Sequence, residues 1–402
     1  MLRKVIKWGC VTFVCIVLAY VVWVAIAMNR SVTISVDYVA LLNEKSAAVP
    51  ENQRAWPLYR DAGIALRKIP MPGEVYIEEE IEEPNWPDEE GWNHVNEWLL
   101  QHHKTLGSIR SASVLQGMGY ILDGKVAEED KELFPYQYAS QQTLPSHDGF
   151  LVSILLPQLS PMRNLAKLVV ADAKDAAISG DALRCEEDLR TMLLLGTHVR
   201  EHPLLINDLV SFSIYNLAFT TLQEVLDKTP ELLSQEQLDR LANELQTLDN
   251  HLAIQFEGEQ MFLLDLLQRM YTDDGNGDGR IAPLDARDAF SQLEAVTVEV
   301  KSISLVPALF APIADLCFAS RKEMREEYER RISYFVQAQE EALEKQPGEY
   351  VFPTEPWVQP TSIINPYFLM DYLTPAYNKA IEHAVTTKNN RDILLERIKK
   401  PL

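Results

Sequence analysis

The residues best suited to chemistry in this chain lie between positions 274 and 285, where the sequence reads Asp-Gly-Asn-Gly-Asp-Gly-Arg-Ile-Ala-Pro-Leu-Asp. An oxygen-bearing side chain recurs at every second position, at Asp274, Asn276 and Asp278, and a further carboxylate follows at Asp285. Glycines separate the first three, so the backbone is free to bend sharply between them. Carboxylate and amide oxygens are the ligands that hard divalent cations prefer. The spacing therefore predicts a site for one such cation.

These twelve residues resemble the calcium-binding loop of an EF-hand, which places oxygen ligands at loop positions 1, 3, 5, 7 and 12 and glycine at position 6. The resemblance implies one bound calcium ion, a helix on each side of the loop, and a positive φ at Gly279. Position 12 departs from the family pattern, because Asp285 is one methylene shorter than the usual glutamate. The ligands that the resemblance implies are Asp274, Asn276, Asp278, the backbone carbonyl of Arg280, and Asp285.

The sequence holds no second loop of this kind, so we expect a structural site rather than a calcium-driven switch. We expect weak binding, with a Kd of about 10⁻⁴ to 10⁻³ M, as in extracellular calcium modules. The alternative interpretation is a glycine-rich acidic turn that binds no metal.

A second string of residues, His198-Val-Arg-Glu201-His202, supports a different hypothesis. It matches the H-x-x-E-H pattern of inverzincin metallopeptidases. On a helix, His198 and His202 would lie one turn apart and share a zinc ion, with Glu201 as the catalytic base. Pro203 ends such a helix at once, and the sequence nominates no third zinc ligand. We therefore favour a polar helix end, with a zinc metallohydrolase as the alternative function.

The charge balance narrows the class of partner. Four of the 37 basic residues and none of the 59 acidic residues stand among the first thirty, which leaves residues 31–402 with a formal charge of −26. So acidic a surface repels phosphate and releases no counterions, and we expect no binding to nucleic acid. The chain also contains no nucleophile elbow, phosphate loop or dinucleotide fingerprint. These features favour a binding or scaffold protein with a protein partner over an enzyme.

The uncharged run from Trp8 to Met28 predicts a transmembrane anchor over residues 8–28. At about 1.5 Å per residue, a helix of this length matches the ~30 Å hydrocarbon core of a bilayer. Basic residues precede it, which predicts a cytoplasmic tail over residues 1–7 and a single-pass protein with an extracytoplasmic body. The alternative is a cleaved signal peptide, since Ala25-Ile26-Ala27 fits a cleavage site. Both interpretations place the body outside the cytoplasm.

Beyond the anchor, apolar residues recur at helical spacing, which predicts an all-α fold, either an irregular bundle or a solenoid-like array of hairpins. We expect a first region over residues 29–159 and a helical domain over residues 160–402 that contains the loop. The expected helices cover residues 36–68 with a break at Pro50, a hairpin from Ser160 that turns at Gly180-Asp181, and residues 204–227, 231–248, 250–272, 313–345 and 375–399. Short strands are expected only at Val32–Val36 and Tyr350–Phe352.

Residues 74–90 hold nine carboxylates and no basic residue, and two prolines interrupt them. A block of like charge is typical of a solvated loop. The functional alternative is a contact for a basic partner or a low-affinity store of cations. For the apolar stretch 303–312 we favour buried packing over a patch that faces a membrane or a partner.

Two cysteines lie in the predicted soluble part, Cys185 and Cys317, each on an apolar helical face. We expect buried free thiols, with a disulfide between them as the alternative that the compartment allows.

Three parts of the sequence resemble membrane-anchored proteins of planctomycete bacteria. They are the apolar run 8–28, the string Ala-Trp-Pro-Leu-Tyr-Arg at 55–60, and the string Leu-Leu-Ile-Asn-Asp-Leu at 204–209. The resemblance implies an anchored, extracytoplasmic protein and implies no particular activity.

Overall fold

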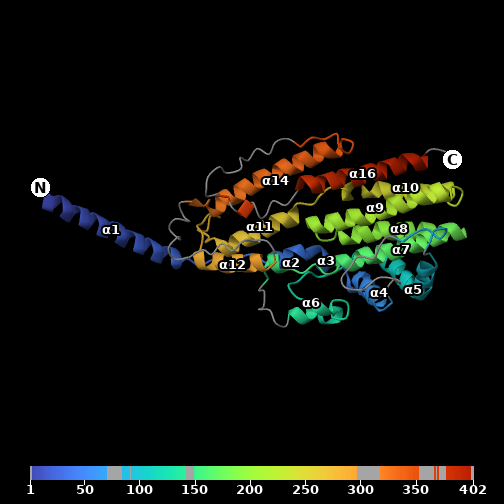
Figure 1. The fold of residues 1–402 in the computed structure, drawn as a ribbon, viewed down its shortest axis with the longest axis horizontal. Helices are drawn as coiled ribbons and strands as arrows, with labels where there is room; N and C mark the ends of the chain where they lie inside the picture. The colour runs from blue at the N-terminus through green and yellow to red at the C-terminus, as the bar shows by residue number, and fades with distance from the viewer. Residues whose placement is uncertain are drawn as a thin grey trace.

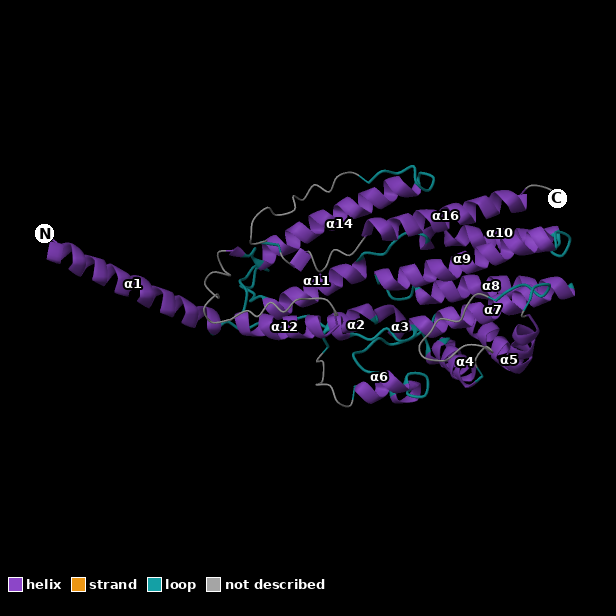
Figure 2. Ribbon diagram, in the orientation of Figure 1, coloured by secondary structure: helices purple, strands orange, loops and turns teal. Residues whose placement is uncertain are grey.

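The computed structural model describes residues 2–69, 84–90, 92–141, 149–296, 317–352, 366–367, 369–370 and 377–399 of the chain. Within these residues the protein consists of α-helices, short 3₁₀ turns and two isolated β-bridges, with no strand (Figure 2). The predicted all-α fold is confirmed for this part of the chain.

The first helix, α1 (Leu2–Met28), extends away from the rest of the molecule (Figure 1). Its stretch Cys10–Met28 is long and apolar enough to cross a membrane, and almost none of it is buried. A signal sequence near an N-terminus shares these properties. The helix therefore fits both the predicted anchor and the alternative of a signal peptide.

The body is a bundle of long helices around α7 (Leu159–Ser179), α8 (Ala182–Val199) and α9 (Leu205–Lys228). On one side, α4 (Trp56–Lys68) and α5 (Trp92–Ser113) pack against α7. On the other, α16 (Tyr377–Lys399) packs against α9, and α10 (Gln235–Thr247) lies against α8 and α16 (Figure 1). The core of this bundle draws buried side chains from Leu42 to Ile398, so both predicted regions, 29–159 and 160–402, share it.

A second, smaller core lies at the end of the body nearest α1. It joins α11 (Glu257–Met270), α12 (Pro283–Val296) and the first turns of α14 (Arg321–Leu343) (Figure 1). Met270, Tyr271 and Met324 are fully buried there. Three short helices complete the described α-helices: α2 (Tyr38–Leu42), α3 (Glu44–Ala48) and α6 (Pro135–Ser140).

The predicted hairpin from residue 160 is present, and its turn follows from two residues. Gly180 ends α7 with a φ of 79°, a left-handed conformation that favours glycine. The Asp181 carboxylate then accepts the backbone N–H of Arg184 at 3.2 Å and so begins α8. By contrast, α14 begins at Arg321, because Ser320 and Glu323 form a capping box there. Of the longer helix predicted over 313–345, residues 313–316 lie outside the described part of the chain.

The prediction of short strands at Val32–Val36 and Tyr350–Phe352 is wrong. The backbone N–H groups of Ser35 and Val36 donate to the side-chain amide oxygen of Gln268, at 3.1 and 3.2 Å, and so need no partner strand. Tyr350 and Phe352 instead pack their rings edge to face, with centroids 5.0 Å apart.

In the described end of the acidic stretch, residues 84–90, the carboxylates Asp88, Glu89 and Glu90 are exposed as predicted, whereas Trp86 is docked on the bundle. Trp86 is only 3% exposed, and the ammonium groups of Lys174 and Lys228 lie 5.5 and 4.9 Å from the centroid of its ring. Its indole N–H donates to Glu224 at 2.9 Å. Cation–π contacts therefore hold this segment to the bundle. The rest of the stretch up to residue 83, and the apolar segment 303–312, lie outside the described residues.

The two body cysteines, Cys185 and Cys317, are free thiols in the structure. Cys185 is buried as expected, whereas Cys317 is only half-buried.

Candidate functional site

The loop predicted to bind calcium connects α11 to α12, as expected for two helices that flank such a loop. Tyr271 and Ile281 form an antiparallel bridge across its base. The Ala282 N–H donates to the Met270 carbonyl at 2.9 Å, and the Thr272 N–H donates to the Arg280 carbonyl at 2.9 Å. These bonds close the loop into a hairpin whose ends are fixed by the second core.

Asp274 organises the tip of the loop. Its Oδ1 accepts the backbone N–H of Asn276 at 2.8 Å and of Asp278 at 3.1 Å. Gly275 and Gly277 complete the bend with φ values of 86° and 85°, a conformation that side chains with a Cβ rarely adopt. Three of the predicted ligands are thereby gathered within one turn.

The expected positive φ at Gly279 is wrong, because the left-handed residues are Gly275 and Gly277. Glycine is needed at position 279 for another reason. A Cβ there would lie 1.9 Å from the carbonyl oxygen of Thr272, which is closer than any van der Waals contact.

The carboxylate of Asp278 faces the start of α14. Its Oδ1 accepts the backbone N–H of Gly279 at 2.7 Å and of Lys322 at 3.2 Å. Burial acts to raise the pKa of Asp278, but hydrogen bonds from the Ser320 hydroxyl and from these two N–H groups outweigh it and lower the pKa. Asp278 is thus an anion held at the positive end of a helix.

The carboxylate of Asp285 faces the segment that follows α1, where its Oδ2 accepts the Val32 N–H at 3.2 Å. The Arg280 carbonyl is also engaged, by the backbone N–H and the hydroxyl of Thr272. Among the described residues, no three His, Cys, Asp or Glu side chains are grouped closely enough to hold a metal ion. The structure therefore brings Asp274, Asn276 and Asp278 together and directs Asp285 elsewhere.

The loop meets two distant segments in what we call the anchor junction: residues 30–36, the α11–α12 loop, and the first turn of α14. The Arg30 guanidinium donates to the Ile281 carbonyl at 3.1 Å. From α14, the backbone N–H of Arg321 donates to the Gly279 carbonyl at 3.1 Å, and its guanidinium pairs with Asp273 at 2.7 Å. One loop thus ties the exit of α1 to two parts of the body.

Sequence reasoning missed the residue that fixes this exit most firmly. Gln268 is 1% exposed, accepts the N–H groups of Ser35 and Val36, and donates to the Val36 carbonyl at 2.8 Å. Asp265, equally buried, accepts the other N–H of the Gln268 amide at 2.9 Å and the Leu151 N–H at 2.8 Å. The available signal was a pair of polar residues on the apolar face of α11.

The string at 198–202, the basis of the zinc hypothesis, is bound within the protein. His198 donates from Nε2 to the Leu115 carbonyl at 3.1 Å and accepts the Tyr59 hydroxyl at Nδ1 at 2.9 Å. α8 ends at Val199, so His202 lies beyond the helix, where its Nε2 shares a 2.9 Å hydrogen bond with Ser46. Burial lowers the pKa of each imidazole to about 4.

Glu201, the proposed base, accepts the Gly119 N–H at 2.9 Å. Because all three side chains of the string already hold structural partners, no contact in the described part of the chain favours zinc chemistry.

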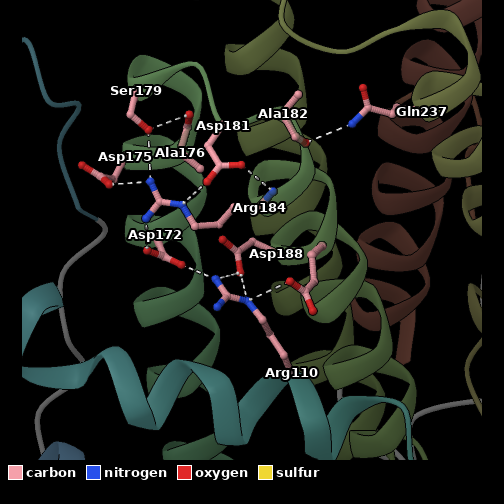
Figure 3. A network of polar contacts seen from close by, with 11 residues as sticks. Arg110, Asp172, Asp175, Ala176, Ser179, Asp181, Ala182, Arg184, Asp188 and Gln237 are labelled. Atoms are coloured by element: carbon pink, nitrogen blue, oxygen red, sulfur yellow. Dashed lines mark hydrogen bonds and ion pairs between the residues drawn. The ribbon is translucent and has the colours of Figure 1, made fainter.

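A cluster of buried charges joins α5, α7 and α8 in the bundle (Figure 3). Arg110 reaches from α5 to Asp188 at 2.8 Å and also pairs with Asp172. Arg184 holds the other oxygen of Asp172 at 3.0 Å and Asp175 at 2.8 Å. Burial raises the pKa of Asp188 well above its usual range. This charge cluster was also missed, although its carboxylates stand among apolar residues of both helices.

The sequence matches no protein-family model, no curated protein and no solved structure. The function is therefore argued from the residues of this chain.

Proposed function

We propose that this protein is a single-pass, membrane-anchored helical binding or scaffold protein whose α11–α12 loop holds one calcium ion. The observation that carries the proposal is the position of the loop. Its oxygen-bearing residues stand where the exit of α1, the small core and the start of α14 meet. A cation bound there would act as a clamp between α11 and α12, and its ligands would be shared with the exit of α1 and the start of α14.

The loop has several features that support a cation. Asp274 curls the tip so that oxygen-bearing residues at loop positions 1, 3 and 5 share one turn. The tip is exposed, so an ion can enter from solvent. Calcium takes six to eight oxygens and tolerates irregular geometry, which suits a site that mixes carboxylates, an amide, a backbone carbonyl and water.

Calcium binding would require one structural change in the loop. Asp278 and Asp285 now accept N–H groups from Lys322 and Val32. To bind the ion, each carboxylate must share or give up that donor. The cost of this exchange explains why we propose weak rather than tight binding, and it couples the ion to α14 and to the exit of α1.

We infer the cellular location of the protein from α1. Basic residues at positions 3, 4 and 7 precede its apolar stretch. They favour a cytoplasmic N-terminus, which leaves the acidic body on the other side of the membrane. Calcium outside the cytoplasm is abundant, which suits a weak structural site.

Calorimetry on the full chain in lipid nanodiscs tests the calcium site. The parent is expected to bind one calcium ion with a Kd of about 10⁻⁴ to 10⁻³ M. Asp278→Asn is expected to weaken binding at least tenfold, because it removes a charged ligand. Asp288→Asn, which removes an exposed carboxylate on α12 beyond the loop, is the control and should bind as the parent does. No calcium heat in the parent, or equal heats in the parent and Asp278→Asn, would remove the site from this account.

A further inference from the structure

A pocket of about 310 Å³ opens between α4, the segment that leads into α6, and the start of α7. Its wall is mostly apolar and includes Leu66, Leu133, Phe134 and Pro157. Tyr136, which is 66% exposed, also lines it, so the pocket is open to solvent. A volume of this size falls within the range of small-molecule sites, roughly 300 to 1,000 Å³.

One charged group lines the pocket among the described residues, the guanidinium of Arg67. It donates one N–H to the Leu133 carbonyl. No carboxylate in the described part of the chain forms an ion pair with it, although acidic residues outnumber basic ones by 22. A guanidinium offers five N–H donors, so Arg67 retains donors for an anion.

A buried polar residue without a partner lies next to the pocket in the chain. Gln158 lies in the chain between two lining residues, Pro157 and Ser160, and is fully buried. Neither its amide nitrogen nor its amide oxygen has a hydrogen-bond partner. An unpaired buried polar group costs about 1–3 kcal/mol, so such groups usually have a partner. Gln158 itself does not line the pocket, so the case for a ligand depends on the Arg67 guanidinium and the apolar wall around it.

We propose that this pocket binds a small amphipathic carboxylate, with its apolar or aromatic body against Leu66, Leu133 and Phe134 and its carboxylate on Arg67. At ~30 Å³ for each water-sized group, the volume holds about ten non-hydrogen atoms. A single guanidinium matches one negative charge, which favours a carboxylate over a doubly charged phosphate. The proposal does not depend on the calcium loop.

The test uses two probes of equal shape, 3-phenylpropanoate and its neutral amide, titrated into the full chain in lipid nanodiscs without calcium. The parent is expected to bind the acid at least tenfold more tightly than the amide. Arg67→Gln should remove this preference and leave the affinity for the amide unchanged. Arg67→Lys should keep the preference, because the positive charge remains.

Ser160→Phe fills the pocket from its wall and is expected to abolish the binding of both probes. Equal affinities for acid and amide in the parent would overturn the proposal, as would an acid preference that survives in Arg67→Gln. Binding that persists in a folded Ser160→Phe would place the probe elsewhere and overturn it too. Because the acid–amide comparison is made in the parent, it decides the matter even if a variant fails to fold.

Discussion

In the bundle around α7–α9, carboxylates such as Asp172 and Asp188 are buried and meet Arg110 and Arg184 on neighbouring helices. In the anchor junction, Asp278 and Asp285 stay half-buried and hold backbone segments that lie about 44 and 253 residues away in the chain. In the first arrangement the charges are paired out of water, so the loss of one partner would leave the other buried and uncompensated. The second joins separate parts of the chain with groups that solvent and ions can still reach. We therefore expect substitutions in the bundle to change the stability of the fold, and ions in solution to act at the junction.

The largest effect should come from breaking the charge cluster. Arg110→Met leaves Asp172 and Asp188 without a shared partner, so the free energy of unfolding should fall by about 3–5 kcal/mol, as for other buried pairs that lose one member. Calcium binding at the junction should not change. Urea unfolding of the full chain measures the loss.

The control is Arg287→Met, which removes an exposed pair with Asp288 and should cost about 1 kcal/mol or less. A loss below that level in Arg110→Met would contradict the structural role of the cluster.

Acid should weaken the bundle through its buried histidines. The pKa of His198 is about 4 in the folded chain against about 6.5 when unfolded, so protonation favours the unfolded state. The stability tied to this imidazole is present above pH 6.5 and is lost as the pH falls towards 4. Between pH 7 and 4.5, the parent should therefore lose about 2–3 kcal/mol more than His198→Gln loses.

Asp208 works in the opposite direction, because burial raises its pKa to about 6 and protonation favours its folded form. Because Asp208 titrates in both proteins, the difference between His198→Gln and the parent isolates the contribution of His198. His103→Gln, at an exposed position of α5, is the control and should keep the full acid sensitivity. If His198→Gln keeps it too, the buried imidazole does not titrate as described.

The smallest of these effects, and the most local, should come from the junction. Gly279→Ala drives a Cβ into the Thr272 carbonyl and disturbs the bonds between Thr272 and Arg280. Two such bonds at about 1 kcal/mol each predict a loss of about 2 kcal/mol, together with weaker calcium binding. The same change at Gly107, on an open face of α5, should instead raise stability by up to about 1 kcal/mol. Equal results at the two glycines would contradict the close approach.

The helices could be predicted because each buries one apolar face, and the pattern of Trp56, Tyr59, Ala62 and Leu66 in α4 is an example. The turn at Gly180 could be predicted from local chemistry alone. The docking of residues 35 and 36 could not, because their partner, Gln268, is more than 230 residues away. A side chain that satisfies a distant backbone leaves no periodic signal.

The same limit applies to the candidate sites. The spacing of residues 274–285 predicted a loop between two helices, but the partners of Asp278 and Asp285 depend on how α14 and the exit of α1 pack. The pocket beside Arg67 had no sequence signal, since its wall comes from three separate segments. Polar residues on apolar helix faces, such as Asp188 and Gln268, predict that a buried partner exists, but the sequence does not identify which residue it is.

Amide hydrogen exchange of the full chain in nanodiscs, with and without calcium, tests the central claim that the loop binds calcium and links the anchor to the body. The amides of Asn276 and Asp278 should exchange at least tenfold more slowly with calcium, because the ion fixes the tip. Those of Val32 and Lys322 should exchange faster, because their carboxylate acceptors turn towards the ion. The amides of α7–α9 should not change. An exchange pattern that calcium leaves unaltered at all four junction amides would contradict the account.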